Sequence, residues 1–96
     1  MTRWIVCVTK HPTHTDPHKR IQSIGTTQVE GSSIPTRQWT VDEMIAAIDS
    51  GDEFYCDDAN GDLVLVVVAQ HNANRYVKTE PDGIQPNNLL AKDDCD

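Results

Sequence analysis

The longest uninterrupted run of apolar residues covers positions 63–69 and has the sequence Leu-Val-Leu-Val-Val-Val-Ala. It is too short to span a bilayer, and its β-branched residues predict a strand that is buried on both faces. The Asn-Gly pair at 60–61 predicts a hairpin with a strand at 53–57, because a type I′ turn needs positive φ at both central residues. The polar residues 71–74 predict a second turn into a strand at 75–79. The apolar run is therefore expected to be the middle strand of three.

The N-terminal part of the chain has a weaker strand pattern. Residues 3–9 are apolar on both alternating sets and rich in β-branched side chains, which predicts a first, well-covered strand. Residues 21–24 predict a short second strand that ends at Gly25. Residues 26–37 contain Gly, Ser and Pro and are expected to be irregular, with at most an edge strand at 26–30.

One helix is expected at about 40–50. Thr40 and Glu43 have the spacing of a capping box, in which each side chain accepts a hydrogen bond from the other residue's backbone N–H. Ser50-Gly51 is a typical helix end. The apolar positions fall on one stripe that would face a core; they are Val41, Met44, Ile45 and Ile48.

These elements predict a single small α+β domain over residues 1–96. We expect an antiparallel sheet of four or five strands with one helix on one face. The strands are expected near 3–9, 21–24, 53–57, 63–69 and 75–79. Because one helix covers one face only, we expect the ordered C-terminal tail with Ile84, Leu89 and Leu90, together with Trp4 or Trp39, to lie across the other face. A homodimer interface over that face is the alternative.

The charge limits the classes of partner. The chain has 8 Lys and Arg against 15 Asp and Glu, a formal charge of −7. This balance argues against nucleic acid, whose phosphates need basic side chains, and against anionic membranes. It permits a basic protein partner.

The three cysteines, Cys7, Cys56 and Cys95, are odd in number and form no CxxC motif, so reduced thiols are expected. Cys7 and Cys56 are expected to pack as small hydrophobic residues inside strands, and Cys95 to lie near a frayed acidic end. With no long apolar segment, a cytoplasmic location is expected.

The C-terminal part of the chain resembles a family called Domain of Unknown Function 3892. Its members typically show a Tyr-apolar-basic-Thr run, an Asp-Gly turn and an Asp-Asn-Leu-Leu run. The matching segments here are Arg75-Tyr76-Val77-Lys78-Thr79, Pro81-Asp82-Gly83 and Asn87-Asn88-Leu89-Leu90, followed by Cys95, and His18-Lys19-Arg20-Ile21 resembles the family's His-x-x-Ile segment. The likeness runs from about His18 to Cys95.

This sequence departs from the family pattern at two points. Asn87 stands where the family usually has Asp, and Ala91-Lys92 replaces a usual Leu-Pro. Any chemistry that depends on the family Asp is therefore in doubt here. The resemblance implies a small α+β domain found in bacteria and their phages, and it implies no activity.

The most interesting polar set follows the last predicted strand; it consists of Thr79, Asp82, Asn87 and Asn88. These side chains could form a hydrogen-bonding pocket for a ligand or a partner's backbone. The alternative, which we favour, is that they satisfy the backbone of an irregular tail lying on the core. Tyr76, between basic neighbours, and His18 are further ligand-binding candidates, although His18 is better explained as the partner of a buried carbonyl or as a cap of the next strand.

A metal site is the weaker interpretation of the histidine-rich loop. His11, His14 and His18 could ligate zinc or nickel, but their spacing fits no closed site and a solvated polar loop is favoured. No cofactor is expected.

Three function classes remain open from the sequence. The first and favoured one is a non-catalytic protein-interaction or regulatory module, acting as a monomer or homodimer with a protein partner. The second is a small-molecule or peptide-binding domain that uses the segment 79–88. The third is a small hydrolase-type enzyme using His18 with Asp82, which requires these groups within hydrogen-bond reach.

Overall fold

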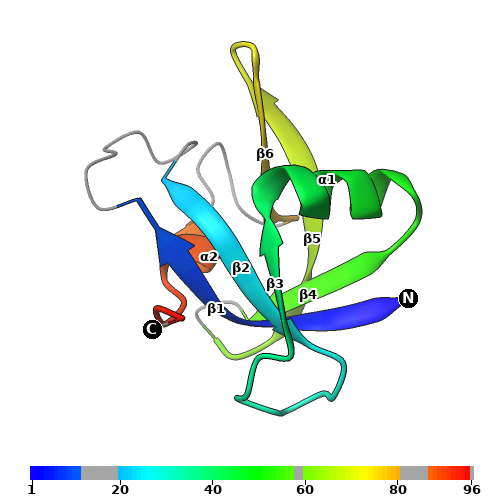
Figure 1. Cartoon of the computed structure of the whole chain (residues 1–96), viewed down its shortest axis with the longest axis vertical. Helices are drawn as coiled ribbons and strands as arrows, with labels where there is room; N and C mark the ends of the chain where they lie inside the picture. The colour runs from blue at the N-terminus through cyan, green and yellow to red at the C-terminus, as the bar shows by residue number, and fades with distance from the viewer. Residues whose placement is uncertain (12–19, 58–59, 81–86, 96) are drawn as a thin grey trace.

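The computed structural model describes residues 1–11, 20–57, 60–80 and 87–95, with no side chain for Asn87. Six strands and two helices follow one another along the chain (Figure 1). They are β1 (Thr2–Lys10), β2 (Ile21–Thr27), β3 (Arg37–Thr40), α1 (Val41–Asp49), β4 (Glu53–Asp57), β5 (Leu63–His71), β6 (Asn74–Thr79) and the short α2 (Asn87–Leu90).

The strands form one sheet in the order β3-β2-β1-β4-β5-β6. Four of the neighbouring pairs are antiparallel, but β1 and β4 are parallel through residues 2–4 and 53–55. The α+β class is therefore confirmed, whereas the prediction of an antiparallel sheet of four or five strands is wrong. A parallel pair joins distant segments, so no local turn signal announces it.

Strand β2 does not end at Gly25 as predicted, but continues to Thr27, with Gly25 paired to Cys7 on β1 and Gln38 on β3. Strand β3 was not predicted; it begins at Arg37, the last residue of the stretch expected to be irregular, and continues to Thr40. It is an edge strand with Trp39 as its one buried residue, so its sequence lacks the apolar alternation of a half-buried strand.

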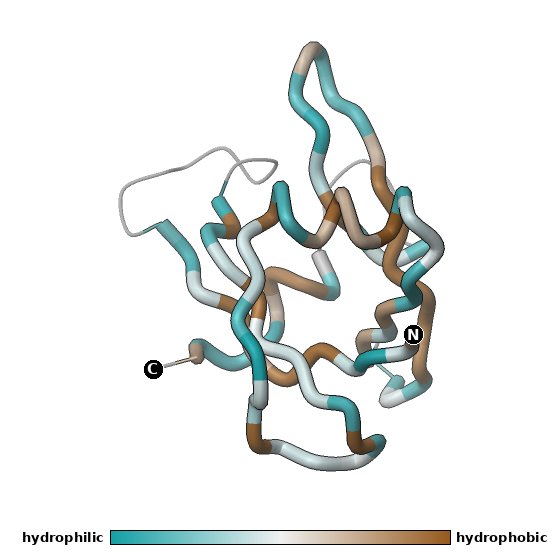
Figure 2. The backbone as a smooth tube through the Cα atoms, turned by 45° about the vertical axis from the view of Figure 1, so that its right-hand side comes forward, coloured by the Kyte–Doolittle hydropathy of each residue, from teal (hydrophilic) through white to brown (hydrophobic). Residues whose placement is uncertain are grey.

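The apolar strand β5 lies between β4 and β6, as predicted, but it is not buried on both faces. Val66 is buried, most of its neighbours are half-buried, and Leu63 is 45% exposed. The pairing contributes to this exposure. β4 pairs with residues 63–65 and β6 with residues 66–71, so each half of β5 has a paired strand along one edge only, and fewer neighbouring side chains cover it. The β5–β6 hairpin also projects past α1 (Figure 1), and its outer part is largely hydrophilic (Figure 2).

Helix α1 forms as its sequence predicts. The Thr40 side chain accepts from the Glu43 backbone at 3.1 Å, and the Glu43 carboxylate accepts from the Thr40 backbone at 2.8 Å, which completes the capping box. Ser50 is the C-cap, and Gly51 follows with φ +104°. At the predicted Asn-Gly turn Gly61 has a positive φ (+83°), as the predicted turn requires of its second central residue.

Both helices contribute to the same apolar cluster. Met44 and Ile45 of α1 join Leu89 of α2 in it, together with Phe54 and Val66 of the sheet. The prediction that the tail covers the face opposite the helix is not confirmed, because Leu89 packs in the cluster that also contains the α1 side chains. Among the described residues, no helix is long and apolar enough to cross a membrane.

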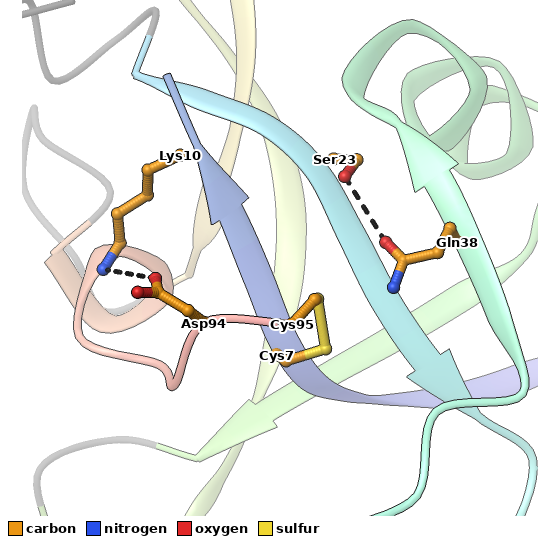
Figure 3. The surroundings of a disulfide bond; sticks show 6 residues. All are labelled: Cys7, Lys10, Ser23, Gln38, Asp94 and Cys95. Carbon is orange, nitrogen blue, oxygen red and sulfur yellow. Dashed lines mark hydrogen bonds and ion pairs between the residues drawn. A yellow bond between two sulfur atoms is a disulfide. The ribbon is translucent and has the colours of Figure 1, made fainter. Parts of the chain in front are cut away.

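A disulfide joins Cys7 of β1 to Cys95, with the two Cα atoms 4.9 Å apart (Figure 3). The prediction of reduced thiols is therefore wrong for this pair and holds for Cys56 alone, which is buried and forms no disulfide. The bond was not predicted because an odd number of cysteines does not indicate a full set of disulfides. The two bonded residues are also 88 positions apart in the sequence, so no local spacing indicates the pair.

The chain around Cys95 is also fixed by backbone hydrogen bonds, contrary to the expected frayed end. The Val8 N–H donates to the Asp93 carbonyl at 2.9 Å, and the Cys95 N–H donates to the Val8 carbonyl at 3.2 Å. Lys10 and Asp94 add an ion pair at 3.7 Å (Figure 3). The tail thus pairs with the part of β1 that extends beyond its contact with β4.

Candidate binding cleft on the outer face of the sheet

Two of the predicted site residues are brought together. Thr79 ends β6 with its side chain fully buried, and the Asn88 side-chain amide of α2 donates to the Thr79 hydroxyl at 2.7 Å. Leu89, which follows Asn88 in α2, is fully buried in the core cluster. This geometry ties α2 to β6, as expected for residues that hold an irregular tail on a core.

Tyr76 does not join that pair. Strand alternation places its side chain on the opposite face of β6 from Val77 and Thr79, beside its cross-strand partner Ala69. It is 5% exposed. Sequence reasoning placed Tyr76 and Thr79 in one candidate set, and the strand separates them.

The remaining predicted site residues have no described side-chain geometry. His18, Asp82 and the side chain of Asn87 lie outside the described residues, as does His14. His11 is described at the end of β1, where its backbone N–H donates to the Arg20 carbonyl at 2.7 Å. No group of three potential metal ligands occurs among the side chains that the structure describes.

A cleft of about 420 Å³ lies elsewhere, and we call it the outer cleft. Its floor includes residues 4–6 of β1 and Tyr55 of β4, with Leu63 of β5 at the rim. Residues 30–33 of the β2–β3 loop and residues 92–93 of the tail also line it, together with Asp57. The outer cleft is therefore assembled from segments that are far apart in the sequence.

The parallel pairing of β1 with β4 places two aromatic residues side by side in the floor. Trp4 and Tyr55 are direct Cα partners, so their side chains project on the same face of the sheet. Both are half-buried, whereas Phe54, the next residue along β4, points into the core and contacts Trp39 edge-to-face at 5.2 Å. Trp4 and Tyr55 thus leave aromatic surface open to the outer cleft.

The charged groups of the outer cleft are mostly acidic. Glu30, Asp57 and Asp93 supply three carboxylates, and Lys92 supplies the one ammonium group among the lining residues. The Lys92 Nζ atom lies 3.6 Å from the Asp57 Oδ2 atom, and the two side chains form an ion pair. Glu30 and Asp93 are both exposed, and the described residues show no ion pair for either side chain.

The tail wall of the cleft is held by the contacts that fix Cys95. The Asp93 carbonyl accepts from Val8, and the disulfide lies two residues further on. This anchoring sets where Lys92 and Asp93 stand relative to the aromatic floor.

Sequence reasoning missed the outer cleft. Trp4 was predicted to lie in a well-covered strand, and it or Trp39 to cover the second face of the sheet with the tail, but nothing local indicates that Trp4 pairs with Tyr55. The one available signal is the alternation in residues 53–57, which separates Tyr55 from Phe54 and Cys56.

Comparison with known proteins adds a family assignment. No curated protein matches the chain, and no solved structure matches it. The family model described as Protein of unknown function (DUF3892) matches residues 4–93, a span that includes the aromatic pair, the capped helix and α2. The chain therefore belongs to the DUF3892 family of proteins of unknown function.

Proposed function

We propose that this protein is a non-catalytic protein-interaction module that binds its partner at the outer cleft. The observation that carries the proposal is a cleft of about 420 Å³ whose floor holds the neighbouring aromatic residues Trp4 and Tyr55. Aromatic residues are enriched at protein interfaces and at the positions that contribute most to binding.

The construction of the cleft supports a binding role. Its floor lies on paired strands, and its tail wall is fixed by backbone hydrogen bonds and a disulfide. A site that is already ordered loses less conformational entropy when a partner binds. The exposed rim residue Leu63 adds apolar area beside the aromatic floor.

The two other function classes have less support. A ligand site in the segment 79–88 would compete with the contact between Thr79 and Asn88, because the Thr79 hydroxyl is fully buried against the tail. A hydrolase that uses His18 and Asp82 remains a prediction without described geometry, since both residues lie outside the described part of the chain.

A cytoplasmic location also remains a prediction. It depended in part on reduced cysteines, and the disulfide between Cys7 and Cys95 removes that support, because disulfides persist mainly in oxidising compartments.

The test compares two substitutions of exposed apolar residues. Leu63→Glu places a charge at the rim of the cleft, and Ile34→Glu places the same charge on a residue that is 71% exposed and does not line the cleft. Wild-type and variant proteins are immobilised and used to capture proteins from host extract, and the captured proteins are quantified by mass spectrometry. Circular dichroism and thermal unfolding confirm that each variant folds.

We expect a defined set of proteins to be retained by the wild type and by Ile34→Glu but lost from Leu63→Glu. If all three proteins retain the same set, the outer cleft is not the binding surface. If light scattering shows a dimer that Leu63→Glu dissociates, the partner is a second copy of the chain.

A further inference from the structure

We propose that the outer cleft binds an arginine side chain presented by a peptide segment of the partner protein. This inference rests on the proposed function and names the chemistry that the cleft recognises. Two features of the cleft carry it: the excess of carboxylates around the rim, and the aromatic pair in the floor.

The charge of the cleft favours a cationic ligand. Among the described residues three carboxylates and one ammonium group line it, and that ammonium group, on Lys92, is already paired with Asp57 at 3.6 Å. Glu30 on the β2–β3 loop and Asp93 on the tail stand on different walls, so a cation between the walls would face carboxylates from both. The formal charge of −7 on the whole chain attracts such a ligand from a distance.

The aromatic floor favours a cation that is also flat. Cations are attracted to the faces of Trp and Tyr rings, and Trp is the strongest of the aromatic residues in this respect. The chain already contains such a contact, because the Arg37 guanidinium carbon lies 3.5 Å from the centroid of the Trp39 ring. Trp4 and Tyr55 offer the same chemistry to a group that comes from outside.

Arginine satisfies both features better than lysine. Its guanidinium is planar and weakly hydrated, so it can stack on an aromatic ring while its N–H groups donate to a carboxylate. A lysine ammonium is a strongly hydrated point charge and gains less from the aromatic floor. The arrangement therefore predicts a preference for arginine over lysine as well as over neutral residues.

The size of the cleft fits a peptide. About 420 Å³ lies in the range of roughly 300–1,000 Å³ that is typical of small-ligand sites. Ser32 and Ser33 line the loop wall, where their hydroxyl groups can hydrogen-bond to the backbone on either side of the arginine.

The experiment uses the full oxidised chain and four synthetic twelve-residue peptides. The peptides share a Gly/Ser background and differ at three positions, which carry Arg, Lys, citrulline or norleucine. Citrulline has nearly the shape of arginine without its charge, so it separates charge from shape. Binding is measured by calorimetry and by the fluorescence of Trp4, with Trp39 as a buried background.

We expect the Arg peptide to bind about tenfold more tightly than the citrulline peptide, and the Lys peptide to lie between them. Glu30→Gln with Asp93→Asn should weaken Arg-peptide binding severalfold. Lys92→Met should strengthen it, because it removes the competing cation. The matched control, Asp49→Asn with Glu53→Gln, makes the same change in charge outside the cleft and should have a much smaller effect.

Equal affinity for the Arg and citrulline peptides, or an equal loss in the cleft and control variants, would overturn the inference. If the norleucine peptide binds best and Leu63→Glu abolishes its binding, the cleft is an apolar interaction site: the proposed function stands and the arginine inference fails. If no peptide binds and Leu63→Glu also retains every captured protein, both fail.

Discussion

Gly25 of β2 lies directly against the sulfur atom of Cys95. A Cβ atom at Gly25 would be 3.1 Å from the Cys95 Sγ and 2.5 Å from the Cys7 Sγ. The absence of a side chain thus makes room for the disulfide, and it explains why a glycine stands inside a strand that continues past it.

Replacing Gly25 with alanine is expected to destabilise the protein. The new methyl group would overlap the disulfide, and overpacking of this kind costs about 1–3 kcal/mol. Urea unfolding of Gly25→Ala measures the loss. The same substitution in a Cys7→Ala, Cys95→Ala background should cost less, because both sulfur atoms are gone; an equal cost in the two backgrounds would show that the disulfide is not the obstacle.

The disulfide predicts a specific count of reactive thiols. Alkylation of the denatured, unreduced protein should modify Cys56 alone, and alkylation after reduction should modify all three cysteines, as counted by mass spectrometry. Reduction should also lower the free energy of unfolding by about 3–5 kcal/mol, because the bond closes a loop across 88 residues of sequence separation. Modification of three cysteines without reductant would contradict the bond.

Asn88→Ala is expected to lower the free energy of unfolding by about 1–2 kcal/mol. The substitution removes the donor to the buried Thr79 hydroxyl and loosens α2, which places Leu89 in the core. Combining it with Thr79→Val in a double-mutant cycle isolates the contact. If chemical unfolding shows no loss in Asn88→Ala, the residue does not anchor the tail, and a ligand-binding role for it gains weight.

The capping box makes part of the stability depend on pH. The hydrogen bond from the Thr40 backbone N–H lowers the pKa of Glu43 below its usual value. A carboxyl group with a lower pKa in the folded state contributes stability at neutral pH, and this contribution is lost as the pH falls through that lowered folded pKa. Glu43→Gln should remove this part of the acid dependence. An NMR titration of Glu43 that gives a pKa at or above the usual value would contradict it.

Arg3 is a buried cation whose replacement should be tolerated. Its Nη1 atom has no hydrogen-bond partner among the residues that the structure describes, and the Asp52 Oδ2 atom lies 3.8 Å from it. Its guanidinium carbon lies 4.9 Å from the Trp39 ring centroid. Arg3→Met keeps the apolar stem and removes the buried charge, so the free energy of unfolding should change by less than about 1 kcal/mol.

The partner substitution, Asp52→Asn, should lower the free energy of unfolding more than Arg3→Met does. It leaves the Arg3 charge buried without its ion-pair partner, which is the costlier way to break such a pair. Thermal unfolding of both variants checks the order, and the reverse order would show that Arg3 itself stabilises the fold.

The sequence predicted the parts of the fold that depend on neighbours in the chain. The helix followed from the capping box at Thr40 and its apolar stripe, and the β4–β5–β6 meander followed from polar turns between apolar runs. Strand β3 was missed because an exposed edge strand with one buried residue carries no alternating pattern. The parallel pair of β1 and β4 was missed because a crossover connection separates the two strands.

The candidate site residues likewise include a pair that is close in the sequence, which could be predicted, and a set joined by long-range pairing, which could not. The proximity of Thr79 and Asn88 was predictable, since a short tail follows β6 closely. The outer cleft was not, because Trp4 and Tyr55 meet only through the long-range pairing of β1 with β4. Its tail wall depends on Cys95 reaching Cys7, and three cysteines offer three possible pairs with no local signal to choose among them.

The bond between positions 7 and 95 makes the polypeptide between them a closed covalent circle. A protease that cuts any single peptide bond within this circle opens it without releasing a fragment. Such a nicked molecule would keep its mass apart from one added water, would migrate as two pieces only after reduction, and could stay folded and occupied by its partner. Because the disulfide keeps both pieces joined, the chain can also be cut by design in an exposed loop, such as the one after β2, and the new N- and C-termini separate no strand from the rest.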